Sequence, residues 1–189
     1  MYKIKALIVD DERLARKELA GLLAEYDSIE IIDEAVNADD ALDKIEKHDP
    51  DVVFLDIQMP GKTGFDLLEM LDGAPRVIFT TAYDEYALKA FEVNALDYLL
   101  KPIREDRFRE SMQKLLREEP GKRINKEEDS KKPKKLSLED QVFVKDGDKC
   151  WFVKLDKVRL FESDGNYIKV YFDTFRPMIH KSLNALDEK

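Results

Sequence analysis

Residues 51–61 read Asp-Val-Val-Phe-Leu-Asp-Ile-Gln-Met-Pro-Gly, and this stretch decides the fold. The apolar run from Val52 to Leu55 predicts a buried strand, and Asp56 follows at its carboxyl end. The Pro60–Gly61 pair then indicates a sharp turn. A strand that ends in this way places the Asp56 carboxylate at the edge of a sheet, where open α/β sheets bind their ligands.

The same pattern occurs at two other places in the chain. Residues 4–9 are mainly apolar and lead into Asp10 and Asp11, and residues 98–100 lead into Lys101. We therefore expect three aspartates and one lysine to meet at one edge of the sheet. Carboxylates held close together repel one another unless a hard cation lies among them, and Mg²⁺ suits a site of a few carboxylates.

Strand and helix patterns alternate through the first 118 residues. Helical spacing of apolar residues predicts helices over about 12–26, 37–48, 64–71, 84–93 and 105–117, between strands at 4–9, 29–32, 52–55, 77–80 and 98–100. Asn37 is a natural N-cap for the second helix. This alternation predicts an α/β fold with a five-stranded parallel sheet that is doubly wound, with helices on both faces.

A different composition begins near residue 119. We interpret residues 119–140 as a charged linker, because this segment has too few apolar residues to form a core. Residues 141–189 predict an all-β unit with two hairpins, whose turns lie at 146–149 and 163–166. A helix is expected from about Lys181.

Composition excludes several classes of protein. No apolar stretch is long enough to span a bilayer and none resembles a signal peptide, so we expect a cytoplasmic protein without a membrane partner. Cys150 is the single cysteine, and the two histidines are far apart, which argues against a zinc site. The net charge of −9 hides a basic segment at 121–135, but residues 136–189 carry nine basic and ten acidic side chains. Charge alone therefore gives no argument for DNA binding.

The motifs resemble the receiver domain of a two-component response regulator. The resemblance covers residues 3–118 and is carried by Asp10-Asp11, by Asp56 with the Ile-Gln-Met-Pro-Gly that follows it, by Thr81-Ala82 and by Tyr98-Leu-Leu-Lys101-Pro. It implies a flavodoxin-like sheet. It also implies a phosphoacceptor regulator rather than an enzyme, one that assists its own Mg²⁺-dependent phosphorylation and dephosphorylation.

The resemblance implies a role for each matching residue. Asp56 is the expected phosphoacceptor, and a phosphohistidine on a sensor histidine kinase is the expected donor. Asp11, Asp56 and the backbone carbonyl of Gln58 are expected to bind Mg²⁺ directly, and Asp10 is expected to act mainly through a bound water. Lys101 and Thr81 are expected to contact phosphoryl oxygens.

Two residues are expected to respond to phosphorylation. In this family the threonine, here Thr81, moves toward the phosphoryl group, and an aromatic on the last strand, here Tyr98, turns inward. The changed surface of the helix at 84–93 and of the helix after Lys101 is then expected to support a homodimer. Thr80 is a rival for the Thr81 role; Thr81 is favoured because alanine follows it.

The second unit resembles the first part of a LytTR DNA-binding domain. The similarity lies in residues 143–149 and 160–167 and in the late Lys181-Ser-Leu. In that family loops between strands read DNA, so the expected contact residues are Asp164, Asn166, Tyr167 and Lys169. The match ends at Lys189, about halfway through such a domain. We therefore expect DNA binding in a longer parent and weak or absent binding by this chain.

Other interpretations remain open. Asp10 and Asp11 could only cap the helix that follows them, and Lys101 could be a surface lysine. A phosphatase or phosphotransferase would carry a second aspartate two residues after its nucleophile, but Gln58 occupies that position. The β-unit could instead bind a protein partner, which leaves the receiver as a switch for that partner.

Overall fold

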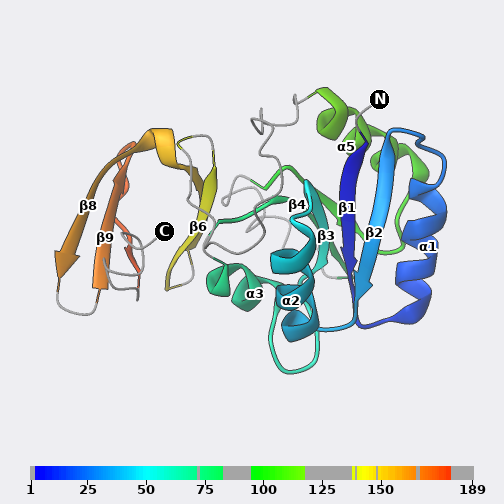
Figure 1. Cartoon of the computed structure of the whole chain (residues 1–189), viewed down its shortest axis with the longest axis horizontal. Helices are drawn as coiled ribbons and strands as arrows, with labels where there is room; N and C mark the ends of the chain where they lie inside the picture. The colour runs from blue at the N-terminus through cyan, green and yellow to red at the C-terminus, as the bar shows by residue number, and fades with distance from the viewer. Residues whose placement is uncertain are drawn as a thin grey trace.

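The computed structural model describes residues 3–71, 73–82, 95–117, 138, 140–147, 149–164 and 167–179. Its first part is a parallel sheet in the order β2-β1-β3-β4-β5, as the alternating pattern predicts. The strands are β1 (Ile4–Val9), β2 (Ile29–Ala35), β3 (Val52–Asp56), β4 (Arg76–Thr81) and β5 (Asp97–Leu100). Almost every residue of β1, β3 and β4 is buried, because helices cover both faces of the sheet (Figure 1).

Four described helices form the outer layers of this unit. They are α1 (Arg13–Leu23), α2 (Ala38–His48), α3 (Gly64–Met70) and α5 (Glu105–Arg117). Helices α1 and α5 share one core with one face of the sheet, and α2 and α3 share a second core with the other face. The prediction of a doubly wound fold is therefore confirmed. The helix expected over 84–93 lies outside the described residues.

Local capping explains where two of these helices begin. The side chain of Asn37 accepts a hydrogen bond from the Asp40 N–H at 2.9 Å, which confirms Asn37 as an N-cap. At α3, Thr63 and Asp66 form a reciprocal capping box.

Among the described residues, no helix combines the length and the apolar character that a membrane span requires.

The second part of the chain is all-β, as expected. Strands β6 (Gln141–Asp146) and β7 (Lys149–Lys154) form a two-stranded hairpin. After a short 3₁₀ turn, β8 (Val158–Asp164), β9 (Tyr167–Phe172) and β10 (Met178–Ile179) form a separate antiparallel sheet in the order β10-β9-β8. Most of the expected linker, residues 119–137, and the helix expected from Lys181 lie outside the described residues.

Candidate functional site

Three strand ends bring their polar residues together at one edge of the parallel sheet. Asp10 follows β1, Asp56 is the last residue of β3, and Lys101 follows β5. The Lys101 Nζ lies 2.6 Å from an Asp10 carboxylate oxygen and 2.7 Å from Asp56 Oδ2. Both aspartates are buried, and only 15% of the Lys101 side chain is exposed. Lys101 is therefore a largely buried counter-ion of both acids here.

Burial and ion pairing together shift the pKa values of Asp56 and Lys101. Burial raises the pKa of Asp56 above its ordinary value, and the hydrogen bond and charge of Lys101 offset only part of that effect. For Lys101, burial alone favours the neutral form. The hydrogen bonds to Asp10 and Asp56 outweigh it and raise the pKa of Lys101 above its ordinary value. The cation therefore stays charged between two acids.

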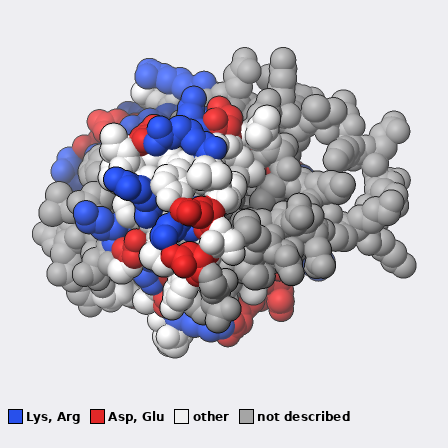
Figure 2. Space-filling model, turned by 90° about the vertical axis from the view of Figure 1, so that its left-hand side faces the viewer, with Lys and Arg blue, Asp and Glu red and all other residues white. Residues whose placement is uncertain are grey.

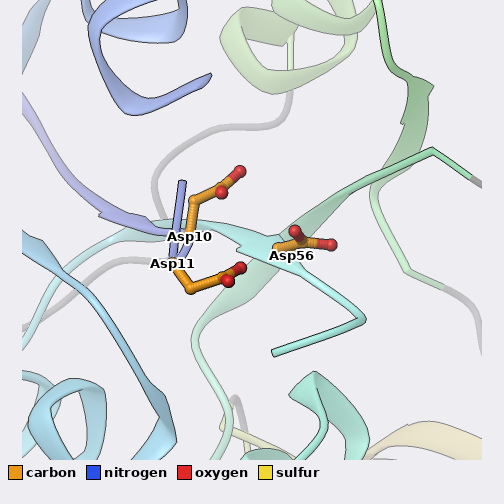
Figure 3. A group of neighbouring side chains, drawn as sticks. All are labelled: Asp10, Asp11 and Asp56. Atoms are coloured by element: carbon orange, nitrogen blue, oxygen red, sulfur yellow. The ribbon is translucent and has the colours of Figure 1, made fainter. Parts of the chain in front are cut away.

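A third carboxylate completes an acidic cluster. Oxygen atoms of Asp10, Asp11 and Asp56 all lie within 4.8 Å of one another, and Asp11 is exposed to solvent. Figure 3 shows the Asp10 and Asp11 side chains extending from the end of β1 on the side of Asp56. A set of hard oxygen donors with one open side fits Mg²⁺, which binds through a few carboxylates and keeps several waters.

Asp10 has a second contact that bears on its role. Its Oδ1 accepts a hydrogen bond from the Glu12 N–H at 2.9 Å, so Asp10 does act on the backbone at the start of α1. Its Oδ2 contacts Lys101 at the same time. The local role and the role at the site therefore coexist in one side chain.

The structure adds Arg16, which the sequence did not indicate. From helix α1 its guanidinium donates to the backbone carbonyl of Asp10 at 2.8 Å and of Asp11 at 3.3 Å, and it forms an ion pair with Glu34 at 2.9 Å. These bonds fix the loop that carries the two acids. No motif marks Arg16; its only signal is a position one helical turn after Glu12.

Thr80 and Thr81 are both buried at the end of β4. Thr80 is the strand neighbour of Asp56 in the parallel register. Thr81 is bonded through its carbonyl to the backbone N–H of Lys101 at 2.7 Å. Both threonines thus lie on β4, which pairs with the strands that carry the site, and the role of Thr81 stays a prediction.

The remaining expected receiver residues lie near this edge. The Gln58 N–H donates to Asp56 Oδ1 at 3.1 Å, and the Gln58 residue is exposed. Tyr98 lies on β5, is partly buried and packs against the core that β4 and α3 share. Its function as a switch stays a prediction.

The residues expected to contact DNA lie on the β8–β9 hairpin. Asp164 ends β8, Tyr167 begins β9 and Lys169 lies two residues further, while Asn166 lies outside the described residues. The Lys169 ammonium contacts an Asp164 carboxylate oxygen at 2.7 Å, and this hydrogen bond raises the pKa of Lys169. On the face shown in Figure 2, lysines and arginines are mixed with acidic residues over the described atoms. The described atoms of this face therefore do not present a uniformly basic patch to a nucleic acid.

Comparison with known proteins agrees with this geometry. Residues 6–113 match the family model of the response regulator receiver domain. An uncharacterized response regulatory protein of Vibrio cholerae is 43% identical over 188 residues, which cover 98% of this chain and 76% of that protein. The transcriptional regulatory protein BtsR of Salmonella typhi is 52% identical over 117 residues, 61% of this chain and 49% of BtsR. The sensory transduction protein LytT of Bacillus anthracis is 49% identical over 114 residues, 59% of this chain and 46% of LytT.

Solved structures give the same result for the first part of the chain. The response regulatory domain of mrkE from Klebsiella pneumoniae has 36% identity and a TM-score of 0.55, and the match covers 60% of this chain and 95% of that domain. A CheX–CheY complex with BeF3 and Mg²⁺ from Borrelia burgdorferi has 25% identity and a TM-score of 0.54, over 61% of this chain and 90% of that one. The matches to BtsR and LytT span about half the length of those relatives.

The all-β unit after the receiver is consistent with the start of a LytTR-like domain, and the relatives include transcriptional regulators. A receiver domain is a regulatory module and not a conventional enzyme. One conclusion follows from the doubly wound sheet, from the family match and from the cluster of Asp10, Asp11, Asp56 and Lys101. The chain belongs to the response regulators of two-component systems, with its receiver domain in residues 6–113.

Proposed function

We propose that this chain receives the signal for a transcription regulator, and that Asp56 accepts a phosphoryl group from a phosphohistidine of a sensor histidine kinase. One observation carries the proposal: the Lys101 ammonium bridges Asp10 and Asp56 beside Asp11. A partly buried cation at this position holds the acceptor carboxylate in one orientation. Its positive charge also stabilises the negative charge on the oxygens of an incoming phosphoryl group.

The transfer exchanges one bond to phosphorus for another. An oxygen of the Asp56 carboxylate forms a bond to phosphorus, and the bond from phosphorus to the imidazole nitrogen of the kinase breaks. The electron pair of the broken bond stays on that nitrogen, and the product is an aspartyl phosphate. Positioning and charge neutralisation supply most of the rate enhancement in such a transfer.

Mg²⁺ is the cofactor that this donor set fits. Asp11, Asp56 and the Gln58 carbonyl are the proposed direct ligands, and Asp10 is proposed to act through a bound water. When bound, the ion offsets the negative charge that the carboxylates and the phosphoryl oxygens bring together. Of the chain's own groups, Lys101 passes from Asp56 to a phosphoryl oxygen, and the Thr81 hydroxyl donates to another.

The response to phosphorylation completes the receiver proposal. Thr81 and Tyr98 change position, and the altered surface that includes α5 supports a homodimer. A phosphoryl group adds about −1.5 to −2 charges and three acceptor oxygens at Asp56, which is the driving change. Sedimentation of the protein with and without the phosphoryl donor measures the dimer.

The phosphoryl transfer is tested with acetyl phosphate and Mg²⁺, followed by intact mass. We expect the wild-type chain to gain one phosphoryl group and Asp56→Asn to gain none. Asp39→Asn is the matched control, because Asp39 is an exposed aspartate in the first turn of α2. A mass gain that persists in Asp56→Asn places the acceptor elsewhere and refutes the assignment.

For the output we propose DNA binding through a LytTR-type domain, with weak or absent binding by the 189 residues of this chain. The alternative is that the β-unit binds a protein partner instead of DNA. The β8–β9 hairpin favours this alternative, because Lys169 is paired with Asp164 and Tyr171 donates to Glu162 at 2.6 Å. A surface already paired in this way also suits a protein partner. Mobility-shift titration of the phosphorylated chain separates the two, since tight, sequence-specific binding by these 189 residues contradicts our expectation.

A further inference from the structure

The β6–β7 hairpin has two buried faces, and each face contacts a different part of the chain. Side chains alternate between the faces along both strands. On one face, Phe143, Cys150 and Phe152 belong to the same core cluster as α2, α3 and the sheet of the receiver. On the other face, Val142, Val144, Trp151 and Val153 form a core with the β8–β10 sheet. In Figure 1, β6 lies between the receiver and the β8–β9 strands.

The receiver face of the hairpin is held by aromatic and ionic contacts with α3. The ring of Phe143 stacks on Phe65 with centroids 6.4 Å apart and planes at 20°. Two positions further along β6, the Lys145 ammonium forms an ion pair with Glu69 and lies 3.7 Å from Asp66. The hairpin thus uses one α3 face for both kinds of contact.

Backbone contacts extend this interface to the segment before β4. The Ala74 N–H donates to the Gln141 carbonyl at 2.8 Å, and the Gln141 side chain donates to the Pro75 carbonyl at 2.7 Å. These two hydrogen bonds join the start of β6 to the receiver segment that precedes β4. An interface with an aromatic centre, ion pairs and backbone hydrogen bonds is a specific docking contact.

The docked helix α3 rests directly on the phosphoacceptor residue. A Cβ added at Gly64, the first residue of α3, would lie 2.5 Å from the Asp56 carbonyl oxygen. The next residue, Phe65, contacts Phe79 of β4 with ring centroids 5.2 Å apart. Because Gly64 leaves no room for a side chain between the start of α3 and the Asp56 backbone, we expect a displacement at Asp56 to shift the α3 surface on which Phe143 is stacked.

The opposite face continues toward the β8–β10 sheet. Trp151 contacts Phe172 and Phe175 with ring centroids 6.0 Å and 5.5 Å apart. The Met178 N–H, in β10, donates to an Asp146 carboxylate oxygen at 3.2 Å. The hairpin is therefore packed against both parts of the chain.

We propose that the β6–β7 hairpin is the element that docks the β-unit on α3 of the receiver, and that phosphorylation of Asp56 weakens this docking. The regulatory half of this statement rests on the proposed function. In the docked form the Asp56 carboxylate is paired with Lys101. A phosphoryl group adds charge and three oxygens where α3 lies against Asp56, so the contacts made by the present α3 surface lose complementarity. By linkage, weaker docking favours phosphorylation to the same degree.

The chain contains its own probe of this contact. Cys150 is the only cysteine and is 6% exposed within the shared core. Its reaction with Ellman's reagent reports the population in which the hairpin has left α3. The docking test compares Lys145→Glu, which sets a carboxylate against Asp66 and Glu69, with Lys149→Glu, an equal charge change at the exposed turn end of the same hairpin.

We expect Lys145→Glu to speed the Cys150 reaction roughly five- to tenfold, because two attractive contacts become repulsive. Lys149→Glu should leave the rate near that of the wild type. Adding Glu69→Lys to Lys145→Glu should restore slow reaction, which shows that the charge pair and not misfolding sets the rate. Equal rates in Lys145→Glu and Lys149→Glu overturn the docking assignment.

The coupling is tested with BeF3⁻ and Mg²⁺ as the mimic of a phosphorylated aspartate. We expect the mimic to speed the Cys150 reaction in the wild type and to have no effect in Asp56→Asn. Intact mass after acetyl phosphate treatment is measured on the same preparations. If the wild type gains a phosphoryl group while the mimic leaves the Cys150 rate unchanged or lowers it, the coupling is wrong and the proposed function stands. If no mass is gained, the proposed function fails, and the Lys145→Glu comparison still decides the docking.

Discussion

The Lys101 ammonium lies 2.7 Å from Asp56 Oδ2, although the two residues are 45 positions apart in the chain. Both side chains are mostly buried, and the same ammonium reaches Asp10 at 2.6 Å. One cation therefore holds two carboxylates that repel each other. This arrangement makes the strand ends dependent on one another for stability as well as for chemistry.

Replacing Lys101 with methionine removes this cation and keeps most of the apolar stem. We expect the free energy of unfolding without Mg²⁺ to fall by about 2 kcal/mol, less than the roughly 3–5 kcal/mol for a fully buried ion pair, because Lys101 is partly exposed. Phosphorylation by acetyl phosphate should slow as well. Urea unfolding measures the first effect and intact mass the second. Lys62→Met is the control, because Lys62 pairs with Asp39 at the surface; an equal loss in both variants contradicts the prediction.

Mg²⁺ should stabilise the folded chain through the acidic cluster. At a concentration 100 times the dissociation constant, binding to the folded state alone adds about 2.7 kcal/mol. Asp11→Asn removes a proposed, exposed ligand without opening the core, and it should remove most of this gain. Thermal unfolding with and without Mg²⁺ measures the difference. Asp39→Asn should respond to Mg²⁺ as the wild type does, and a full response by Asp11→Asn excludes that residue as a ligand.

Gly64→Ala should disturb the phosphoacceptor strand. The new methyl group meets the Asp56 carbonyl oxygen at 2.5 Å and Leu55 Cγ at 3.1 Å, so the start of α3 must move. We expect a loss of about 1–3 kcal/mol in the free energy of unfolding, as for other overpacked sites. Gly21→Ala is the matched control, since nothing lies within 4 Å of its added Cβ and alanine is favoured inside α1. An unchanged stability in Gly64→Ala shows that α3 is not seated on Asp56.

Asp66 should contribute a pH-dependent part of the stability. The backbone N–H of Thr63 donates to Asp66 at 2.8 Å and lowers the pKa of Asp66, with help from the Thr63 hydroxyl and from Lys145. A lowered pKa in the folded state stabilises the ionised form. This contribution is present above the ordinary aspartate pKa of about 3.9 and is lost as the pH falls through the lowered pKa.

Asp66→Asn is the variant that isolates this contribution. The difference in unfolding free energy between the wild type and Asp66→Asn should be largest near neutral pH and should shrink below about pH 4. Urea unfolding at several pH values measures it. A difference that grows in acid gives the wrong sign and contradicts the capping-box assignment.

The meeting of the site residues at one edge of the sheet was predictable from the sequence. Parallel strands joined by right-handed crossovers place all their carboxyl ends on one side, so Asp10, Asp56 and Lys101 are brought together wherever the strands are correctly identified. That topology brings the residues to one edge, and the packed structure sets the contacts of 2.6–2.7 Å between them. The choice between Thr80 and Thr81 did not follow, because both are buried at the end of the same strand.

The contacts of Arg16 and of the β6–β7 hairpin could not be predicted from sequence patterns. Arg16 resembles any helix-surface cation in the sequence, yet it bonds the backbone that carries Asp10 and Asp11. In β6 and β7 the apolar residues occupy both faces, which predicts burial on each side without naming the covering element. Charge counts likewise could not show that Lys145 pairs with α3.

The amino-acid sequence by itself determined the order of strands and helices, the caps at Asn37 and Thr63, and the strand ends that carry the acids, because these depend on local periodicity and on residues a few positions apart. The tertiary structure alone decided that Lys101 bridges two acids, that Arg16 fixes their loop and that Phe143 stacks on Phe65. The Lys101 and Phe143 contacts join residues distant in the chain, and the Arg16 contact depends on how α1 packs against the end of β1. Their partners are selected by the packing of whole elements, which local sequence does not encode.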